Sequence, residues 1–245
     1  MAAKTLKVCV DKLLTPKQRE KARELAIKEN PANAVGGEGG AELALETRTL
    51  WKPGRVLRVR FLDGVPSVQA KVEKYAHMWE RYANIKFVFG NDPSAEIRIS
   101  FMQEGSWSYL GTDALTIPKT KPTMNYGWLK PNTPEEEYSR VVLHEFGHAL
   151  GCIHEHQHPK NGIQWNKEAV YRYFAQQGWS KAQVDFNMFN KYSETQTQFS
   201  RFDKKSIMLY PIRPEWTLDG FSTDWNKVLS LSDRGFIRRT YPPTP

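Results

Sequence analysis

The sequence predicts an α+β fold in which helices pack against a sheet. Three observations support this prediction. Alternating apolar residues predict strands over residues 55–61, 85–89 and 97–101, an amphipathic helix separates the first two strands, and a second long helix follows from about residue 133. With 245 residues, the chain can bury one main core with a small appendage.

The first element is an N-terminal helix. The tetrapeptide Thr15-Pro16-Lys17-Gln18 combines a capping hydroxyl, a proline at the first helical position and a glutamine that completes a capping box, so a helix is expected to about Lys28. The stretch 33–40 contains four glycines, which predict a flexible connection. We therefore expect an N-terminal helical extension over residues 1–40 and a main domain over residues 41–245.

The main domain is expected to begin with a half-buried strand, which has Leu57, Val59 and Phe61 on one face and two arginines on the other. A helix should follow from Pro66 to about Asn84, because its apolar residues step by four and three positions. The next two strands also place apolar residues at alternate positions.

The remaining segments are expected to be less regular. Residues 105–129 are rich in Gly, Pro, Ser and aromatic residues, which predicts loops and a short edge strand around residues 123–128. Two further helices are expected over residues 166–177 and 180–190.

Composition excludes several classes of protein. The net charge of +8 and the pI near 9.4 come from scattered residues without a basic run or a recognition motif, so no nucleic-acid partner is expected. Two cysteines give no disulfide framework, and no stretch approaches ~18 apolar residues, so no membrane span is expected. The N-terminus lacks the apolar region of a signal peptide, which predicts a cytoplasmic chain unless another export route or a missing leader applies.

A histidine pair lies in the second long helix. The tetrapeptide Thr133-Pro134-Glu135-Glu136 repeats the helix-start signal, so this helix should run to about Leu150. His144 and His148 are four residues apart and share one face, where both rings could bind one metal ion at ~2.0 to 2.1 Å. Glu145 lies beside them, offset so that it can reach a metal-bound water.

A third histidine follows a predicted reversal of the chain. Gly151 can adopt the left-handed conformation that ends the helix, after which His154 returns to the metal. Five of the six histidines fall between positions 144 and 158. Because a catalytic zinc site has three protein ligands and an open position, we expect His156 and His158 in loop hydrogen bonds rather than at the metal.

Two motifs together resemble a known clan of zinc peptidases, the metzincins. Ser206-Ile207-Met208-Leu209-Tyr210 resembles the Met-turn of astacins and serralysins, and Glu155 extends the histidine motif to its astacin form. The following residues lack the arginine and acidic run of astacins, and the usual disulfides are absent. The resemblance covers about residues 55–242 and identifies an astacin-like metzincin. Its signature H-E-x-x-H-x-x-G-x-x-H is formed by His144, Glu145, His148, Gly151 and His154.

The resemblance implies a metzincin-like domain with a twisted, mostly parallel sheet, two long helices including the zinc-binding one, and a mostly helical C-terminal subdomain. It also implies one catalytic zinc ion on the three motif histidines and endopeptidase activity on proteins or peptides by a monomer. Glu145 would be the general base, Met208 the apolar floor below the metal, and Tyr210 the residue that stabilises the oxyanion. In astacins, the acid at the position of Glu155 anchors the mature N-terminus.

Cys9 leaves three alternatives open. Its thiolate could occupy the open metal position, as in some latent metzincins, which would make residues 1–40 a pro-segment. It could instead be an inert packed thiol or form a disulfide with Cys152. Asp11 could also cap the zinc in place of Cys9.

The substrate and the function class also leave alternatives. The resemblance implies that an extended peptide binds along an edge strand, for which residues 123–128 are the candidate, with Tyr126 and Trp128 either lining a subsite or packing. A catalytically silent binding domain that retains zinc is a second hypothesis, against which Glu145 argues, because a structural site needs no base. A third hypothesis, binding of acidic polymers, rests on net charge alone.

Overall fold

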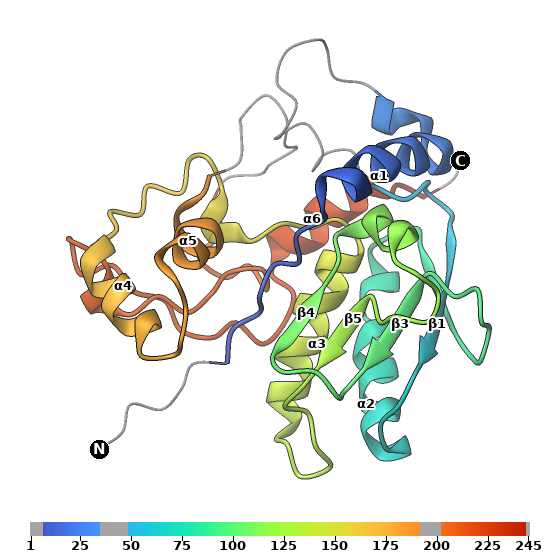
Figure 1. Cartoon of the computed structure of the whole chain (residues 1–245), viewed down its shortest axis with the longest axis horizontal. Coiled ribbons are helices and arrows are strands. Elements are labelled where there is room, and N and C mark those ends of the chain that lie inside the picture. Colours follow the sequence, from blue (N-terminus) through green and yellow to red (C-terminus); the bar gives the residue numbers. More distant parts are fainter. Residues whose placement is uncertain (1–6, 35–48, 192–201, 244–245) are drawn as a thin grey trace.

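A five-stranded sheet forms the centre of the computed structural model, which describes residues 7–34, 49–191 and 202–243. The strand order is β2-β1-β3-β5-β4 (Figure 1). Four strands run parallel to their neighbours, and β4 lies antiparallel to β5 at one edge. The expected mostly parallel α+β fold is therefore confirmed. The strands are β1 (Val56–Phe61), β2 (Lys86–Phe89), β3 (Ile97–Ser100), β4 (Ser106–Ser108) and β5 (Met124–Tyr126).

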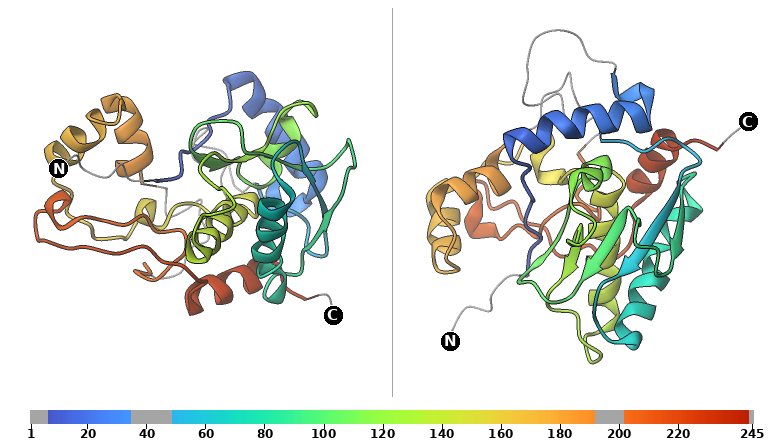
Figure 2. Two further views of the ribbon diagram at one scale, coloured as in Figure 1. Left: turned by 90° about the horizontal axis from the view of Figure 1, so that it is seen from below. Right: turned by 45° about the vertical axis from the view of Figure 1, so that its right-hand side comes forward.

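Two helices, α2 (Pro66–Ala76) and α3 (Glu135–Ala149), pack side by side on one face of this sheet (Figure 2). Every residue of α3 from position 138 to 149 is buried, and its apolar side chains join those of α2 and the strands in the main core. Because this helix is enclosed along most of its length, its side chains are held in fixed positions.

The N-terminal helix has the predicted start. α1 (Pro16–Glu29) begins with a complete capping box between Thr15 and Gln18. It packs on the short 3-10 helix η3 (Gly111–Thr116), and Leu14, Ala22 and Ile117 form a small apolar cluster there. The glycine-rich connection expected up to Gly40 lies outside the described residues, as does the proposed boundary.

An extended stretch precedes α1, and we call residues 7–14 the N-terminal segment. It runs between the β4 edge of the sheet and the part of the chain that contains α4 (Lys167–Ala175) and α5 (Lys181–Val184) (Figure 1). Cys9 forms a parallel bridge with Ser106 of β4, and Val10 N donates to Ser106 O at 3.2 Å. The segment therefore pairs with the edge strand β4 through one isolated parallel bridge.

Three details differ from the sequence prediction. β5 lies between β3 and β4, so the prediction of an edge strand at residues 123–128 was wrong, and β4 forms the edge on this side of the sheet. The prediction of a capping box at Thr133 was also wrong. The Thr133 hydroxyl accepts a hydrogen bond from Lys130 N at 3.0 Å, and the helix starts after Pro134. The helix expected over residues 66–84 ends at Ala76 and is followed by the 3-10 helix η2 (Trp79–Arg81).

The C-terminal part is held by two groups of contacts. α4 and α5 pack in a second apolar cluster with the π-helical turn η5 (Asp185–Phe189), which continues α5 without a break, so the helix expected over residues 180–190 is present with its second half in π geometry. The last helix, α6 (Leu231–Thr240), returns to the main core. Among the described residues, no helix combines the length and apolarity that a membrane span requires.

Candidate metal centre

Helix α3 carries the first half of the site. His144, Glu145 and His148 lie in its buried final turns and are 6%, 0% and 1% exposed. Gly151 follows with a φ of +89°, the left-handed conformation that the sequence predicts, and a Cβ here would lie 2.9 Å from a Leu50 carbon. The chain then reverses and brings His154 back towards the helix.

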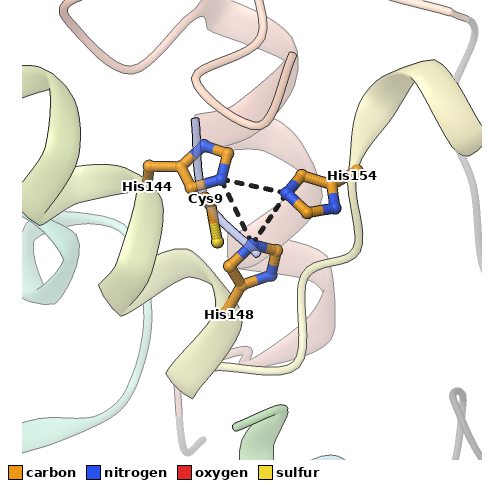
Figure 3. A group of neighbouring side chains, drawn as sticks. All are labelled: Cys9, His144, His148 and His154. Atoms are coloured by element: carbon orange, nitrogen blue, oxygen red, sulfur yellow. Dashed lines mark hydrogen bonds between the residues drawn. The ribbon is translucent and has the colours of Figure 1, made fainter. Parts of the chain in front are cut away.

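The three imidazole rings converge on one point (Figure 3). The Nε2 atoms of His144, His148 and His154 are 3.2 Å apart in all three pairs. Three nitrogen ligands of a tetrahedral zinc ion at ~2.0 to 2.1 Å would be about 3.3 Å from one another. The spacing of these three nitrogens therefore fits a zinc ion.

The second nitrogen of each ring meets a hydrogen-bond acceptor. The Nδ1 atoms of the first two rings donate to the main-chain oxygens of Ile207 and Cys152, each at 2.8 Å, and that of His154 contacts the Asp11 carboxylate at 3.2 Å. Burial lowers the pKa of all three rings, that of His148 to about 3, so the rings are neutral. With the protons on Nδ1, three Nε2 lone pairs face one another and need a cation between them.

The Met-turn lies against α3. Met208 is 3% exposed, and a Cβ added to Gly147 of α3 would lie 2.5 Å from its sulfur. Asp233 of α6 fixes this turn by accepting hydrogen bonds from Ser206 Oγ at 2.7 Å and from Ile207 N at 2.9 Å. The turn therefore supports the metal centre both by packing on α3 and through the main-chain oxygen that holds His144.

Glu145 and Cys9 meet beside the three rings. The Cys9 thiol donates to Glu145 Oε2 at 3.3 Å, while Oε1 of Glu145 is buried with no hydrogen-bond partner among the described residues. Burial raises the pKa of Glu145 to about 8, and burial together with the charge of Glu145 raises that of Cys9. The Cys9 sulfur and the three Nε2 atoms all lie within 4.8 Å of one another, so Cys9 completes a four-residue group that could hold a metal.

Tyr210 packs against the rings of His154 and His156. Its ring centroid is 4.5 Å from that of His154 and 4.4 Å from that of His156. The Tyr210 hydroxyl donates a hydrogen bond to the main-chain oxygen of Cys9. The N-terminal segment therefore engages both Glu145 and Tyr210 directly.

Further polar contacts fix the N-terminal segment. Arg140 of α3 donates to the main-chain oxygen of Lys7 at 3.3 Å and pairs with Glu137 at 2.6 Å. The Arg140 guanidinium also stacks 3.8 Å from the ring centre of Trp225. On the opposite side, Asp11 N donates to Asn187 Oδ1 in η5 at 3.1 Å. The segment is thus held by residues from both sides of the metal centre.

The disulfide alternative for Cys9 was wrong. Cys9 and Cys152 are both free and buried, and Cys152 contributes its main-chain oxygen to His148. Asp11 lies behind His154, at Nδ1, and not at the face where the three Nε2 atoms converge. Of the two residues considered as a metal cap, Cys9 is the one placed beside the Nε2 atoms.

The next residues of the motif region have separate contacts. His156 Nε2 bonds to Asn187 O at 2.7 Å, and His158 is buried outside the four-residue group, as expected of loop residues. Glu155 accepts from Asp203 N at 2.7 Å. Burial, together with the nearby carboxylates of Asp233 and Asp203, raises the pKa of Glu155 to about 7.

Sequence reasoning missed several residues that shape the site. Asp233 could have been found from the capping box that it forms with Ser230 at the start of α6, although nothing local indicates its bonds to the Met-turn. Arg140 stands one turn before His144, but its contact with Lys7 spans more than one hundred residues. Such contacts depend on the folded path of the N-terminal segment.

Comparison with known proteins agrees with this geometry. The model of the astacin peptidase family matches residues 45–214. A structure of myroilysin is 50% identical with a TM-score of 0.78, covering 80% of this chain and 97% of that chain. A second myroilysin structure is 44% identical with a TM-score of 0.64, covering 96% of this chain and 100% of that chain.

A more distant match shares the fold. High choriolytic enzyme 1, a hatching enzyme zinc-protease from the medaka fish Oryzias latipes, is 19% identical with a TM-score of 0.57, and the match covers 86% of this chain and 100% of that chain. No curated protein sequence matches the chain. Since the family model spans more than half of the residues, the chain belongs to the astacin family of zinc metalloendopeptidases, which act on proteins or peptides.

Proposed function

We propose that the chain is made as a latent endopeptidase in which His144, His148 and His154 hold a catalytic zinc ion and Glu145 is the general base. The observation that carries this proposal is the convergence of three neutral Nε2 atoms at 3.2 Å, next to a fully buried carboxylate. Three imidazole ligands leave one position for a water or for an incoming ligand, as in a catalytic zinc site.

Bound zinc would lower the pKa of a water molecule and polarise the scissile carbonyl. Glu145 takes the proton from the attacking water and delivers it to the leaving amine. Its Oε1, which is buried beside the three rings with no hydrogen-bond partner among the described residues, is available to accept that proton.

Tyr210 is proposed to stabilise the oxyanion. Its hydroxyl already donates to a main-chain oxygen, that of Cys9, within the metal centre. When the N-terminal segment leaves, this hydroxyl is proposed to donate instead to the oxygen of a substrate peptide, whose negative charge increases in the transition state. Met208 supports the rings from below through its contact with Gly147.

The N-terminal segment is proposed to keep the chain latent, with residues 1–40 as a pro-segment. Cys9 brings a thiol to within 4.8 Å of the three Nε2 atoms and occupies Glu145 Oε2. A thiolate is a strong zinc ligand, so Cys9 would close the position that water needs. The same segment also engages Tyr210, so the proposed base and the proposed oxyanion donor are both occupied.

One observation favours the alternative of a silent zinc-containing domain. Three histidines and a cysteine are also the composition of a closed structural zinc site. A structural site, however, has no use for a buried carboxylate beside its ligands. The two functions differ in whether loss of the N-terminal segment produces activity that requires Glu145.

The test compares wild type, C9A and E145A before and after limited proteolysis that removes the N-terminal segment, as followed by mass. Casein and a peptide library serve as substrates, and zinc content is measured for each sample. We expect wild type to become active when the segment is lost and C9A to show weaker latency. E145A should keep its zinc and stay at least ~100-fold less active. Inactive, zinc-loaded wild type after loss of the segment would exclude the peptidase function.

A further inference from the structure

The N-terminal segment lies at the metal centre as an extended peptide, and two side chains outside it hold its main chain. Arg140 donates to Lys7 O at 3.3 Å, and Tyr210 donates to Cys9 O. Both acceptors are main-chain oxygens, which every peptide offers. Tyr210 already has a proposed role in the reaction. Arg140, one turn before His144 on α3, binds the same peptide and has no role yet.

The Arg140 guanidinium is fixed by residues that do not belong to the segment. Its Nε and Nη2 donate to the two Glu137 carboxylate oxygens at 2.8 and 2.6 Å, and its central carbon lies 3.8 Å from the ring centre of Trp225. Trp128 Nε1 in turn donates to Glu137 Oε1 at 2.8 Å. Because Nη2 carries two hydrogens, one N–H serves Glu137 and the other serves Lys7 O. This donor keeps its support when the segment leaves.

The surroundings of this donor favour a neutral acceptor. Arg140 is 5% exposed, and its charge is already balanced by Glu137. A second carboxylate at the same place would be repelled by Glu137. A peptide carbonyl is neutral, and it receives a stronger hydrogen bond from a guanidinium than from an uncharged donor. The site therefore suits the main chain of a peptide, whatever its side chains are.

We propose that Arg140 is a substrate-binding residue that holds a main-chain carbonyl of the peptide two residues away from the position at the metal. The distance of two residues is that from Lys7 to Cys9 in the segment. The inference rests on the proposed function, because it assumes that a substrate takes the place of the segment. It also sets a minimum length, since only a peptide that extends this far beyond the cleaved bond reaches Arg140. Internal bonds of a chain are thereby favoured over terminal ones.

The experiment combines enzyme variants with altered peptides. Full-length wild type and R140Q are activated by the same limited proteolysis, and a peptide that wild type cuts is identified by mass. Two analogues of it carry sulfur in place of one carbonyl oxygen, at the second residue before or after the cleaved bond, because a thioamide accepts hydrogen bonds poorly. R58Q is the matched control. Arg58 of β1 is also paired with a carboxylate, that of Glu96, and β3 and β5 separate β1 from β4.

We expect R140Q to lose about tenfold in kcat/KM on the unaltered peptide, mainly through KM, because a charge-assisted hydrogen bond to the substrate is lost. One of the two thioamide peptides should lose about threefold or more with wild type and nothing further with R140Q. This coupling identifies the carbonyl that Arg140 holds. R58Q should behave as wild type does on all three peptides.

Two results would overturn the inference. If R140Q cuts the unaltered peptide as well as wild type does, Arg140 serves the segment alone. If R140Q loses the same factor on all three peptides, the arginine supports the fold and does not bind the substrate. Thermal unfolding of each variant checks the fold. If R140Q does not fold, R140K replaces it, because lysine keeps the charge but lacks the fork that binds Glu137 and a carbonyl together.

Failure of this inference can be told apart from failure of the proposed function. If activated wild type cuts no peptide, the proposed function fails and this inference fails with it. If wild type cuts the peptide and neither thioamide shows coupling to Arg140, only the inference is wrong.

Discussion

The main core and the N-terminal segment are held by different kinds of contact. The core encloses α2, α3 and the strands with large apolar side chains, among them Trp51, Trp79 and Phe146. The N-terminal segment is held by separate polar contacts, including those of Arg140 and Asn187, and by a few apolar side chains such as Val8 and Leu14 in the smaller clusters. Dense apolar packing is cooperative, whereas a row of separate polar contacts can open locally. The molecule thus combines a densely packed apolar scaffold with a more lightly held segment, the part that we propose is released.

The largest expected effect comes from overfilling the core below the metal centre. In G147V, the new Cβ would lie 2.5 Å from the Met208 sulfur and 3.2 Å from Trp79. We expect a loss of about 3 kcal/mol in the free energy of unfolding, measured by urea titration, because neither neighbour can move freely. G90V is the matched control, because nothing lies within 4 Å of the Cβ position there. A G147V protein as stable as G90V would show that the core is less rigid than described.

A pH-dependent effect on stability is expected at Asp113, in the 3-10 helix η3 on which α1 packs. Burial raises the pKa of Asp113 in η3 from 3.8 to about 7, and Arg19 of α1 partly opposes this shift. Because the folded pKa is raised, the neutral form favours folding, and its contribution is complete below about pH 4 and is lost as pH rises through 7. D113N, which stays neutral, should therefore exceed wild type in stability at pH 8 and equal it near pH 3.5.

The size of this difference should be about 2 kcal/mol. In a fully buried group, a pKa shift from 3.8 to about 7 would change the free energy of unfolding by roughly twice this amount. Asp113 keeps partial solvent contact, which reduces the effect. Urea titrations of both proteins across this pH range provide the measurement. A difference that is constant with pH would mean that the ionisation of Asp113 is not involved.

The smallest expected effect concerns a single contact of the N-terminal segment. Lys12 Nζ lies 4.3 Å from the ring centre of Trp107 in β4. K12M keeps most of the stem and removes the charge, so it should weaken the segment by about 0.5–1 kcal/mol and leave the core unchanged. Hydrogen exchange of the Val10 amide should become about two- to fivefold faster. K86M, at an exposed position of β2, serves as the control. Equal exchange of the Val10 amide in both variants would show that the contact between Lys12 and Trp107 does not stabilise the segment.

Local signals predicted the elements that depend on neighbouring residues. The capping box of Thr15 and Gln18 and the left-handed Gly151 are both as expected, because each needs only a few adjacent residues. The similar signal at Thr133 failed because its hydroxyl serves a preceding turn instead. A motif thus predicts what its residues can do, while the surrounding chain decides which option is used.

The sequence did not predict β4 or the position of Cys9 beside the metal centre. β4 was missed because three residues with two serines show no apolar alternation, and their burial comes from β5 and from Cys9. The meeting of Cys9 with Glu145 joins positions 136 residues apart. The spacing of the histidines predicted that the rings come together. The positions of their hydrogen-bond partners and of Cys9 depend on tertiary contacts, which the local sequence does not show.

The direct connection between the N-terminal segment and α1 has a consequence for how firmly the metal centre is covered. Since α1 is docked on η3 and the segment follows within a few residues, the Cys9 thiol is presented at a local concentration in the millimolar range or above. Each polar contact can therefore be weak and still be formed almost all the time. A single cut between Asp11 and α1 would abolish that advantage, and the part of the chain before the cut would be diluted into solution without any change in the contacts themselves.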